Sequence, residues 1–170
     1  MAKSRSQFVV DANVLIDLRD GRILDRLGRL PEQFIVADIV VADDIDEPDE
    51  AVLTGVGIGI LPLSGDAVQE VVAVTGSCRG ISVADAASLV LAEQVGCTLL
   101  TGDKLLRGLA LSRGVKVHGT LWLLDRMAEG GALTGEQAAV ALERMLECGR
   151  RLPKPEARNR ILDWRADEEG

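Results

Sequence analysis

The sequence predicts an α/β fold of three layers, with a central parallel sheet and helices on both faces. Short apolar runs of strand length alternate along the chain with longer segments whose apolar residues recur at helical spacing. This alternation is typical of a parallel sheet whose strands are joined by helices. Glycine or proline stands at the ends of most helical segments, where each residue type commonly stops a helix.

The order of the elements follows from these patterns. Apolar runs predict strands at residues 8–11, 34–37, 58–63, 98–101 and 115–117. Helical spacing predicts helices at residues 15–30, 38–47, 65–74, 82–95, 103–113, 120–129, 135–149 and 157–166. We therefore expect a main domain over residues 1–130 and a helical C-terminal extension over residues 131–170 that packs on it.

The composition of the 170 residues is that of one globular domain, with 47% apolar and 27% charged residues. Cys78, Cys97 and Cys148 are odd in number and form no C-x-x-C pair, which argues against a disulfide framework or a zinc site. The N-terminus has too few apolar residues for a signal peptide, and no apolar stretch is long enough to span a bilayer. We expect a soluble protein of the reducing cytoplasm, without a membrane partner.

The net charge of −8 is unevenly distributed along the chain. Residues 31–78 contain ten acidic residues and no lysine or arginine. This segment is either a solvated acidic face or a region that meets a cation or a basic partner. The acidic balance and the scarcity of aromatic residues argue against a general nucleic-acid binder, which needs a basic field and stacking rings.

Four aspartates stand near the predicted ends of strands or the start of a helix. Asp11 and Asp103 follow strands, Asp43 lies shortly after another strand, and Asp85 opens a helix. Each could be a helix cap or an exposed charge. In a parallel sheet, however, Asp11, Asp85 and Asp103 meet at the carboxyl edge, where ligands of such sheets bind.

The energetics of such a cluster favour a metal site. Two carboxylates 5 Å apart repel by roughly 3 kcal/mol at an effective dielectric near 20, whereas a helix N-terminus returns only about 0.3–1 kcal/mol. A bound Mg²⁺ or Mn²⁺ can offset the remaining repulsion between the carboxylates, since hard cations prefer oxygen ligands.

Other kinds of catalytic site fit the sequence less well. A phosphotransfer site of the Asp-x-Asp type needs an acid where Asn13 stands. His118 is the only histidine, and at a strand end a structural role is commoner than a catalytic one. The glycines of residues 55–59 match neither a dinucleotide fingerprint nor a phosphate loop.

Three segments carry a family resemblance. Residues 9–17 (VVDANVLID), 81–87 (ISVADAA) and 99–103 (LLTGD) resemble the acidic motifs of PIN domains, the PilT N-terminus fold. Residues 114–121 (GVKVHGTL) are similar to the closing strand and helix of the toxin-like nuclease subgroup. The resemblance covers roughly residues 8–130.

This resemblance implies a metal-dependent ribonuclease, often the toxin of a toxin–antitoxin pair. It implies that Asp11, Asp85 and Asp103 are metal-site acids, that Asn13 and Thr101 support the pocket, and that Ser82 holds the nearby loop. The family usually has glutamate as its second acid. Here Asp43 is the preferred equivalent, and Asp44 and Glu47 are alternatives.

The functional hypothesis is a Mg²⁺- or Mn²⁺-dependent endoribonuclease that uses Asp11, Asp43, Asp85 and Asp103. The alternatives are a catalytically weak PIN-fold scaffold that binds proteins, and a phosphatase or DNA nuclease with the same metal site. The resemblance further implies a small antitoxin partner and a homodimer. Apolar residues of the extension also suggest self-association, and its arginines could face the acidic segment 31–78 within the chain or across a dimer.

Overall fold

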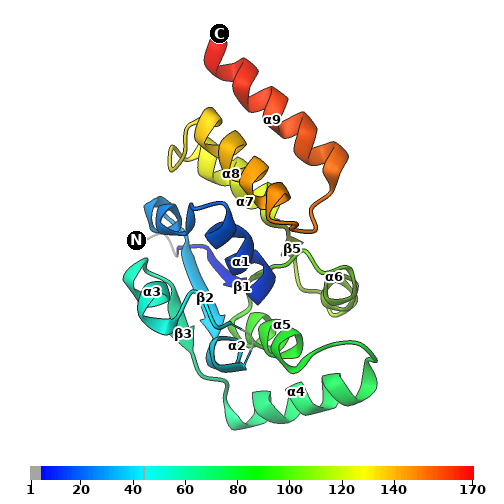
Figure 1. Ribbon diagram of the computed structural model, residues 1–170. Helices are drawn as coiled ribbons and strands as arrows, with labels where there is room; N and C mark the ends of the chain where they lie inside the picture. Colours follow the sequence, from blue (N-terminus) through cyan, green and yellow to red (C-terminus); the bar gives the residue numbers. More distant parts are fainter. Residues whose placement is uncertain (1–4, 44) are drawn as a thin grey trace.

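The computed structural model describes residues 5–43 and 45–170. These residues form a five-stranded sheet in the order β3-β2-β1-β4-β5, in which every neighbouring pair is parallel (Figure 1). The strands are β1 (Gln7–Val10), β2 (Gln33–Ala37), β3 (Gly59–Leu61), β4 (Thr98–Leu100) and β5 (Val117–His118). The predicted α/β fold with a central parallel sheet is confirmed.

The centre of the sheet is apolar on both faces. In β1, the consecutive residues Phe8, Val9 and Val10 are all buried, as expected for a strand that helices cover on both sides. Val9 is paired with Ile35 of β2 and with Leu99 of β4, and these two are also buried. The core of the protein therefore passes through β1, which also leads directly into the candidate site.

Helices flank the sheet and connect its strands. They are α1 (Ala12–Asp20), the 3₁₀ helix η1 (Leu24–Arg29), α2 (Asp38–Asp43), α3 (Glu50–Gly55), α4 (Gly65–Ser77), α5 (Val83–Val95), α6 (Lys104–Ser112), α7 (Thr120–Glu129), α8 (Gly135–Glu147) and α9 (Lys154–Glu169). Helix α5 packs on β1, β2 and β4, with α4 packed on α5 in turn, while α8 packs on α1, α7 and α9. In Figure 1, α4 and α5 lie at one end of the molecule and α7, α8 and α9 at the other.

Some boundaries differ from the sequence prediction. Helix α3 was not predicted, although Asp49 marks its start by accepting a hydrogen bond from Val52 N–H at 2.9 Å. The helix predicted at residues 38–47 ends, in the described chain, at Asp43. Helix α9 begins earlier than predicted because Pro155 lies in its first turn, where the missing N–H of proline costs no hydrogen bond. Short elements with few apolar residues were the hardest to place.

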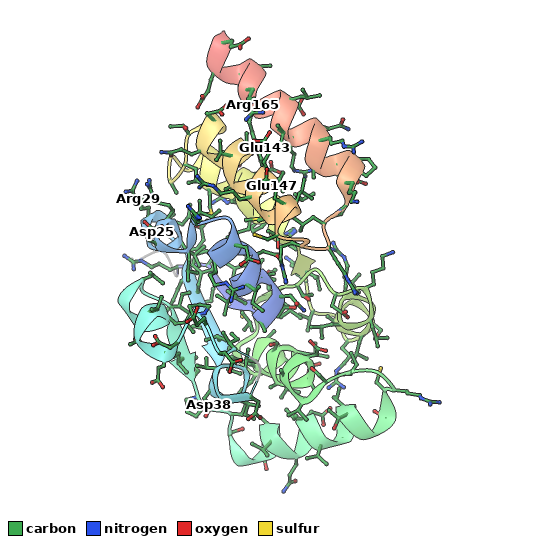
Figure 2. All side chains as sticks on the ribbon, in the orientation of Figure 1. Asp25, Arg29, Asp38, Glu143, Glu147 and Arg165 are labelled. Atoms are coloured by element: carbon green, nitrogen blue, oxygen red, sulfur yellow. The ribbon has the colours of Figure 1, made fainter. Side chains whose placement is uncertain are left out.

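The C-terminal extension covers its own apolar residues against the rest of the chain. Six of the apolar residues that suggested self-association are buried, namely Leu133, Ala138, Ala141, Met145, Ile161 and Trp164. Val140, Leu146 and Leu152 are half-buried, and Leu162 has 66% of its surface exposed. Ion pairs from Arg165 to Glu143 and Glu136 link α9 to α8, and Figure 2 labels Arg165 and Glu143 where these helices face each other.

Two arginines of the extension bind partners other than those predicted. Arg150 Nε donates to Asp17 Oδ1 of α1 at 2.5 Å, and Arg160 Nε donates to Asp125 Oδ2 of α7 at 2.8 Å. Within the chain, the expectation that these arginines face the acidic segment 31–78 is therefore wrong. The extension packs on α1 and α7 instead, so its guanidinium groups meet the carboxylates of those helices.

Residues 5–43 and 45–170 include no helix that combines the length and the apolar character needed to cross a membrane.

The close approach of α8 and α9 depends on the absence of a side chain at Gly135. A Cβ atom there would lie 2.5 Å from the carbonyl oxygen of Trp164. We expect Gly135→Ala to lower the free energy of unfolding by about 1–3 kcal/mol, because overpacking of this size strains the backbone. The matched control is Gly76→Ala in α4, where a Cβ would meet no atom within 4 Å. It should raise stability by up to about 1 kcal/mol through helix propensity.

Urea unfolding of the two variants and of the wild type measures this difference. Stabilisation of both variants by the same amount would contradict the close packing of α8 against α9.

Candidate functional site

The candidate site lies at the carboxyl edge of the two central strands, β1 and β4. Val10 and Leu100 are partners in the parallel register, and each is the last residue of its strand. The next residues, Asp11 and Thr101, are therefore neighbours across the strands. The N–H of Asp11 continues the ladder by donating to the carbonyl oxygen of Leu100 at 3.1 Å.

The hydroxyl of Thr101 joins Asp11 to Asp103. It donates a short hydrogen bond to Asp11 Oδ2 and accepts one from the backbone N–H of Asp103 at 3.1 Å. Thr101 is completely buried and Asp11 is 2% exposed. The predicted supporting role of Thr101 thus has a geometric basis: this side chain fixes one carboxylate and the backbone of the residue that carries the other.

Asp11 and Asp103 also cap the helices that follow them. Asp11 Oδ1 accepts from the N–H of Val14 at 2.9 Å, and Asp103 Oδ1 accepts from the N–H of Leu106 at 2.8 Å. Capping and ligand binding are compatible, because each cap uses only the Oδ1 atom. Asp11 Oδ2 accepts from Thr101 but, as a carboxylate oxygen, has a second lone pair for a ligand. The caps hold both carboxylates in one orientation.

Asp85 reaches the site through the first turn of α5. It forms a capping box with Ser82, in which Ser82 N–H donates to Asp85 Oδ2 at 3.2 Å and Asp85 N–H donates to Ser82 Oγ at 3.0 Å. These bonds join Ser82 to Asp85, and the supporting role of Ser82 that the family resemblance implies stays a prediction. Because α5 packs against β1, the negative charge of Asp85 lies close enough to raise the pKa of Asp11.

The pKa of Asp11 is raised to about 7 from the ordinary value of 3.8. Burial is the largest cause, since it removes water from the carboxylate, and the charges of Asp85 and Asp17 add to it. Hydrogen bonds from Thr101 and Val14 act in the opposite direction but are too weak to restore the ordinary value. A carboxylate in this position favours a cation beside it.

Asp17, Thr120 and Arg150 form a second polar group near the first, which the sequence analysis did not identify. Asp17 Oδ2 accepts from the hydroxyl of Thr120 at 2.6 Å, and its Oδ1 accepts from Arg150. Arg150 Nη2 also donates to the backbone oxygen of Asn13 at 3.2 Å and to its side-chain oxygen at 3.4 Å. The pKa of Asp17 is raised overall. Burial is the largest cause, and the bonds from Thr120 and Arg150 lower the pKa by less than burial raises it.

The spacing between Asn13 and Asp17 was a signal in the sequence that the two residues lie together. Asn13 and Asp17 are four residues apart and so lie on one face of α1. Nothing in the sequence indicated their partner, because Arg150 is 133 residues away from Asp17.

The second acid of the predicted set is not joined to the others. Asp43 is exposed at the end of α2 and lines an open cavity together with Asp38, Asp49 and Glu50. The alternative Glu47 is exposed, and its carbonyl oxygen accepts from Arg19 at 2.8 Å. The other alternative, Asp44, lies outside the described residues. The identity of the second acid stays a prediction.

The donor set consists of oxygen atoms and suits a divalent cation such as Mg²⁺ or Mn²⁺. In residues 5–43 and 45–170, no three acidic, histidine or cysteine side chains are close enough to enclose a metal ion. Mg²⁺ does not require such a cage, because it commonly keeps several waters and binds through one or two carboxylates and substrate phosphates. Asp11 offers one such carboxylate, Thr101 joins it to the backbone of Asp103, and the charge of Asp85 acts on it.

Comparison with known proteins places this chain in a family. A protein-family model described as DUF3368, a PIN domain, matches residues 7–166. Among solved structures, the chain is similar to a PilT N-terminus domain protein from the hyperthermophilic archaeon Sulfolobus solfataricus P2. That similarity has 12% sequence identity and a TM-score of 0.49, and it covers 73% of this chain and 92% of that chain. A search of curated proteins found no match.

The family match spans the sheet, the acidic edge and nearly all of the C-terminal extension. The protein therefore belongs to the PIN-domain family, whose members are in general metal-dependent nucleases.

Proposed function

We propose that this protein is a divalent-metal-dependent endoribonuclease. The observation that carries the proposal is the buried carboxylate of Asp11 at the edge of the sheet. Thr101 links it to Asp103, and the charge of Asp85 acts on it. A buried carboxylate of this kind costs free energy to keep ionised when no cation is beside it, and its oxygen atoms are suited to binding a cation.

Each residue has a defined part in the proposed reaction. Asp11, Asp85 and Asp103 would hold Mg²⁺ or Mn²⁺, with Asp43 as the preferred further acid and Asp44 or Glu47 as the alternatives. Such a cation, when bound, polarises the phosphate that is cut and lowers the pKa of a bound water for in-line attack. Thr101 and Ser82 would keep Asp11 and Asp85 oriented through the hydrogen bonds described above. Asn13 would support the mouth of the site.

A second candidate function is a PIN-fold scaffold that binds proteins and cleaves RNA weakly or not at all. The lack of a three-ligand cluster among the described residues supports it, as does the position of Asp43. RNA cleavage separates the two, because a scaffold predicts no metal-dependent product. Cleavage of DNA in place of RNA would point to a DNA nuclease, which with a phosphatase makes up the remaining alternatives.

We expect Asp11→Asn and Asp85→Asn each to lower RNA cleavage by about 100-fold or more. Loss of an outer-shell partner costs 10–100-fold, and loss of a direct ligand should cost at least as much. The control is Asp163→Asn, an exposed acid on α9, which should cleave at the wild-type rate. The measurement is cleavage of a mixed-sequence RNA with saturating Mn²⁺, with circular dichroism to verify folding. Near-wild-type activity in both site variants would remove the metal-site assignment.

The raised pKa of Asp11 predicts how the metal-free protein responds to pH. Because the pKa is 3.8 ordinarily and about 7 in the folded state, the folded state holds an extra proton between these values. The resulting stabilisation is complete below pH 4 and is lost as the pH rises through 7. Asp11→Asn should remove this part of the pH dependence, so the variant should equal or exceed the wild type in stability at pH 8.

Urea unfolding in EDTA between pH 4.5 and 8 tests this expectation. The change in free energy of unfolding over this range should be smaller in Asp11→Asn than in the wild type. Parallel curves for the two proteins would show that Asp11 has an ordinary pKa.

We further propose that the protein is the toxin of a toxin–antitoxin pair, with a small antitoxin as its partner, and that it forms a homodimer. The proposal rests on the resemblance to toxin-like PIN nucleases and on the acidic segment 31–78, which suits a basic partner. The apolar residues of the extension no longer support it, since most are covered within the chain. Light scattering over a range of micromolar concentrations should report a dimer, and a monomer throughout would contradict self-association.

A further inference from the structure

A cavity of about 250 Å³ lies beside the acidic edge, and three separate parts of the chain form it. Helix α1 contributes Asn13 and Asp17, the connection from β4 to α6 contributes Gly102 and Asp103, and the linker after α8 contributes residues 149–151. Asp103 therefore belongs both to this cavity and to the acid group that Thr101 connects. A ligand in the cavity would be next to the proposed metal site.

The linker reaches the cavity because of the way α8 ends. Gly149 has a φ of +79°, a conformation that favours glycine. Its N–H donates to Leu146 at 3.0 Å, and the N–H of Arg150 donates to Met145 at 3.0 Å. These two bonds form a Schellman motif, which closes the helix and turns the chain sharply. The turn directs Arg150 and Arg151 towards α1 and the edge of the sheet.

Arg150 is fixed in place at the cavity wall. Its Nε is bound to Asp17, which is itself held by Thr120, and its Nη2 is bound to Asn13. The bonds fix the guanidinium plane and use two of its nitrogens. Because Arg150 forms an ion pair with Asp17, its positive charge largely offsets the negative charge of Asp17. Arg151 is different: it is exposed at the cavity, and no ion pair forms between it and an acid in the described chain.

The size of the cavity and the guanidinium group of Arg151 suit a phosphate of a nucleic-acid strand, although the carboxylate of Asp103 also lines the cavity. At about 250 Å³ it is below the roughly 300–1,000 Å³ of typical small-molecule pockets, so it fits a phosphate group better than a whole free ligand. Arginine is well suited to bind phosphate, since its planar donors match the phosphate oxygens. Gly102 adds no side chain to the wall, and a Cβ there would meet no atom within 4 Å, which leaves room for a backbone to pass.

We propose that this cavity binds an RNA phosphate next to the one that is cut, with Arg151 as its main contact and Arg150 as a fixed donor beside it. The inference rests on the proposed ribonuclease function and adds a substrate requirement to it. The protein should need a phosphate flanking the cleavage site, and so should act within a strand in preference to a single phosphate ester. In this arrangement the C-terminal extension supplies part of the substrate site.

The test compares Arg151→Ala with Arg151→Lys and with the control Arg158→Ala, an exposed arginine of α9 outside the cavity. Affinity for a fluorescent RNA oligonucleotide is measured by anisotropy in EDTA, where cleavage does not interfere, at several salt concentrations. We expect Arg151→Ala to weaken binding by about 5–10-fold. The slope of log affinity against log salt should fall by about 0.7, the value for one phosphate contact on a single strand.

Arg151→Lys should restore most of the salt slope, and Arg158→Ala should match the wild type. With Mn²⁺ present, Arg151→Ala should raise the KM for RNA while kcat stays within about twofold.

Wild-type binding by Arg151→Ala, in a protein that cleaves RNA, would overturn this inference and leave the proposed function standing. Equal losses in Arg151→Ala and Arg158→Ala would overturn it too. A wild type that neither binds nor cleaves RNA would overturn both.

Discussion

The hydrogen bond from the Thr101 hydroxyl to Asp11 is the interaction on which the rest of the site depends. It forms because β1 and β4 are parallel neighbours that end at the same level. The same hydroxyl accepts from the backbone of Asp103, so one buried side chain sets the relation between two acids 92 residues apart. A buried carboxylate without such partners would cost several kcal/mol more to keep ionised.

Helices bring the remaining charges to this edge. The capping box of α5 fixes Asp85 close enough to Asp11 to affect its pKa. On the other side, α8 packs on α1 and ends in a turn that carries Arg150 to Asp17. The acidic edge and the C-terminal arginines are thus parts of one arrangement, in which carboxylates suited to a cation lie beside guanidinium groups suited to a phosphate. A metal-dependent nuclease needs both kinds of charge, because its substrate is an anion and its cofactor is a cation.

Most of the sheet, and the positions of Asp11, Asp85 and Asp103 at the starts of their helices, could be predicted from the sequence because the signals were local. A strand such as Phe8–Val10, buried on both faces, is a continuous apolar run. Asp11 directly follows this run, and Asp103 lies three residues after the end of β4. Parallel pairing then places these acids at one edge. Residues 82–85 fit the capping-box pattern, which indicated the start of a helix at Ser82, and the structure contains this capping box.

The parts that were missed depend on contacts distant in sequence or on weak local signals. The Asp17–Arg150 pair joins α1 to the linker after α8, and no spacing rule connects residues so far apart. Helix α3 is six residues long and has a single buried residue, Leu53, so it carries almost no periodicity. The segment after α2 has several acids in a row, which left the choice among Asp43, Asp44 and Glu47 open, and Asp43 proved to be exposed.

The central claim is that Asp11 and its neighbours bind a divalent cation, and calorimetric titration of Mn²⁺ into the wild type and into Asp11→Asn at pH 8 tests it most directly. This pH lies above the raised pKa of Asp11, so that the carboxylate is ionised and able to bind. The account predicts binding of Mn²⁺ by the wild type and a loss of at least about tenfold in affinity in the variant, with both proteins folded. Equal affinity in the two proteins, or no binding by the wild type, would contradict it.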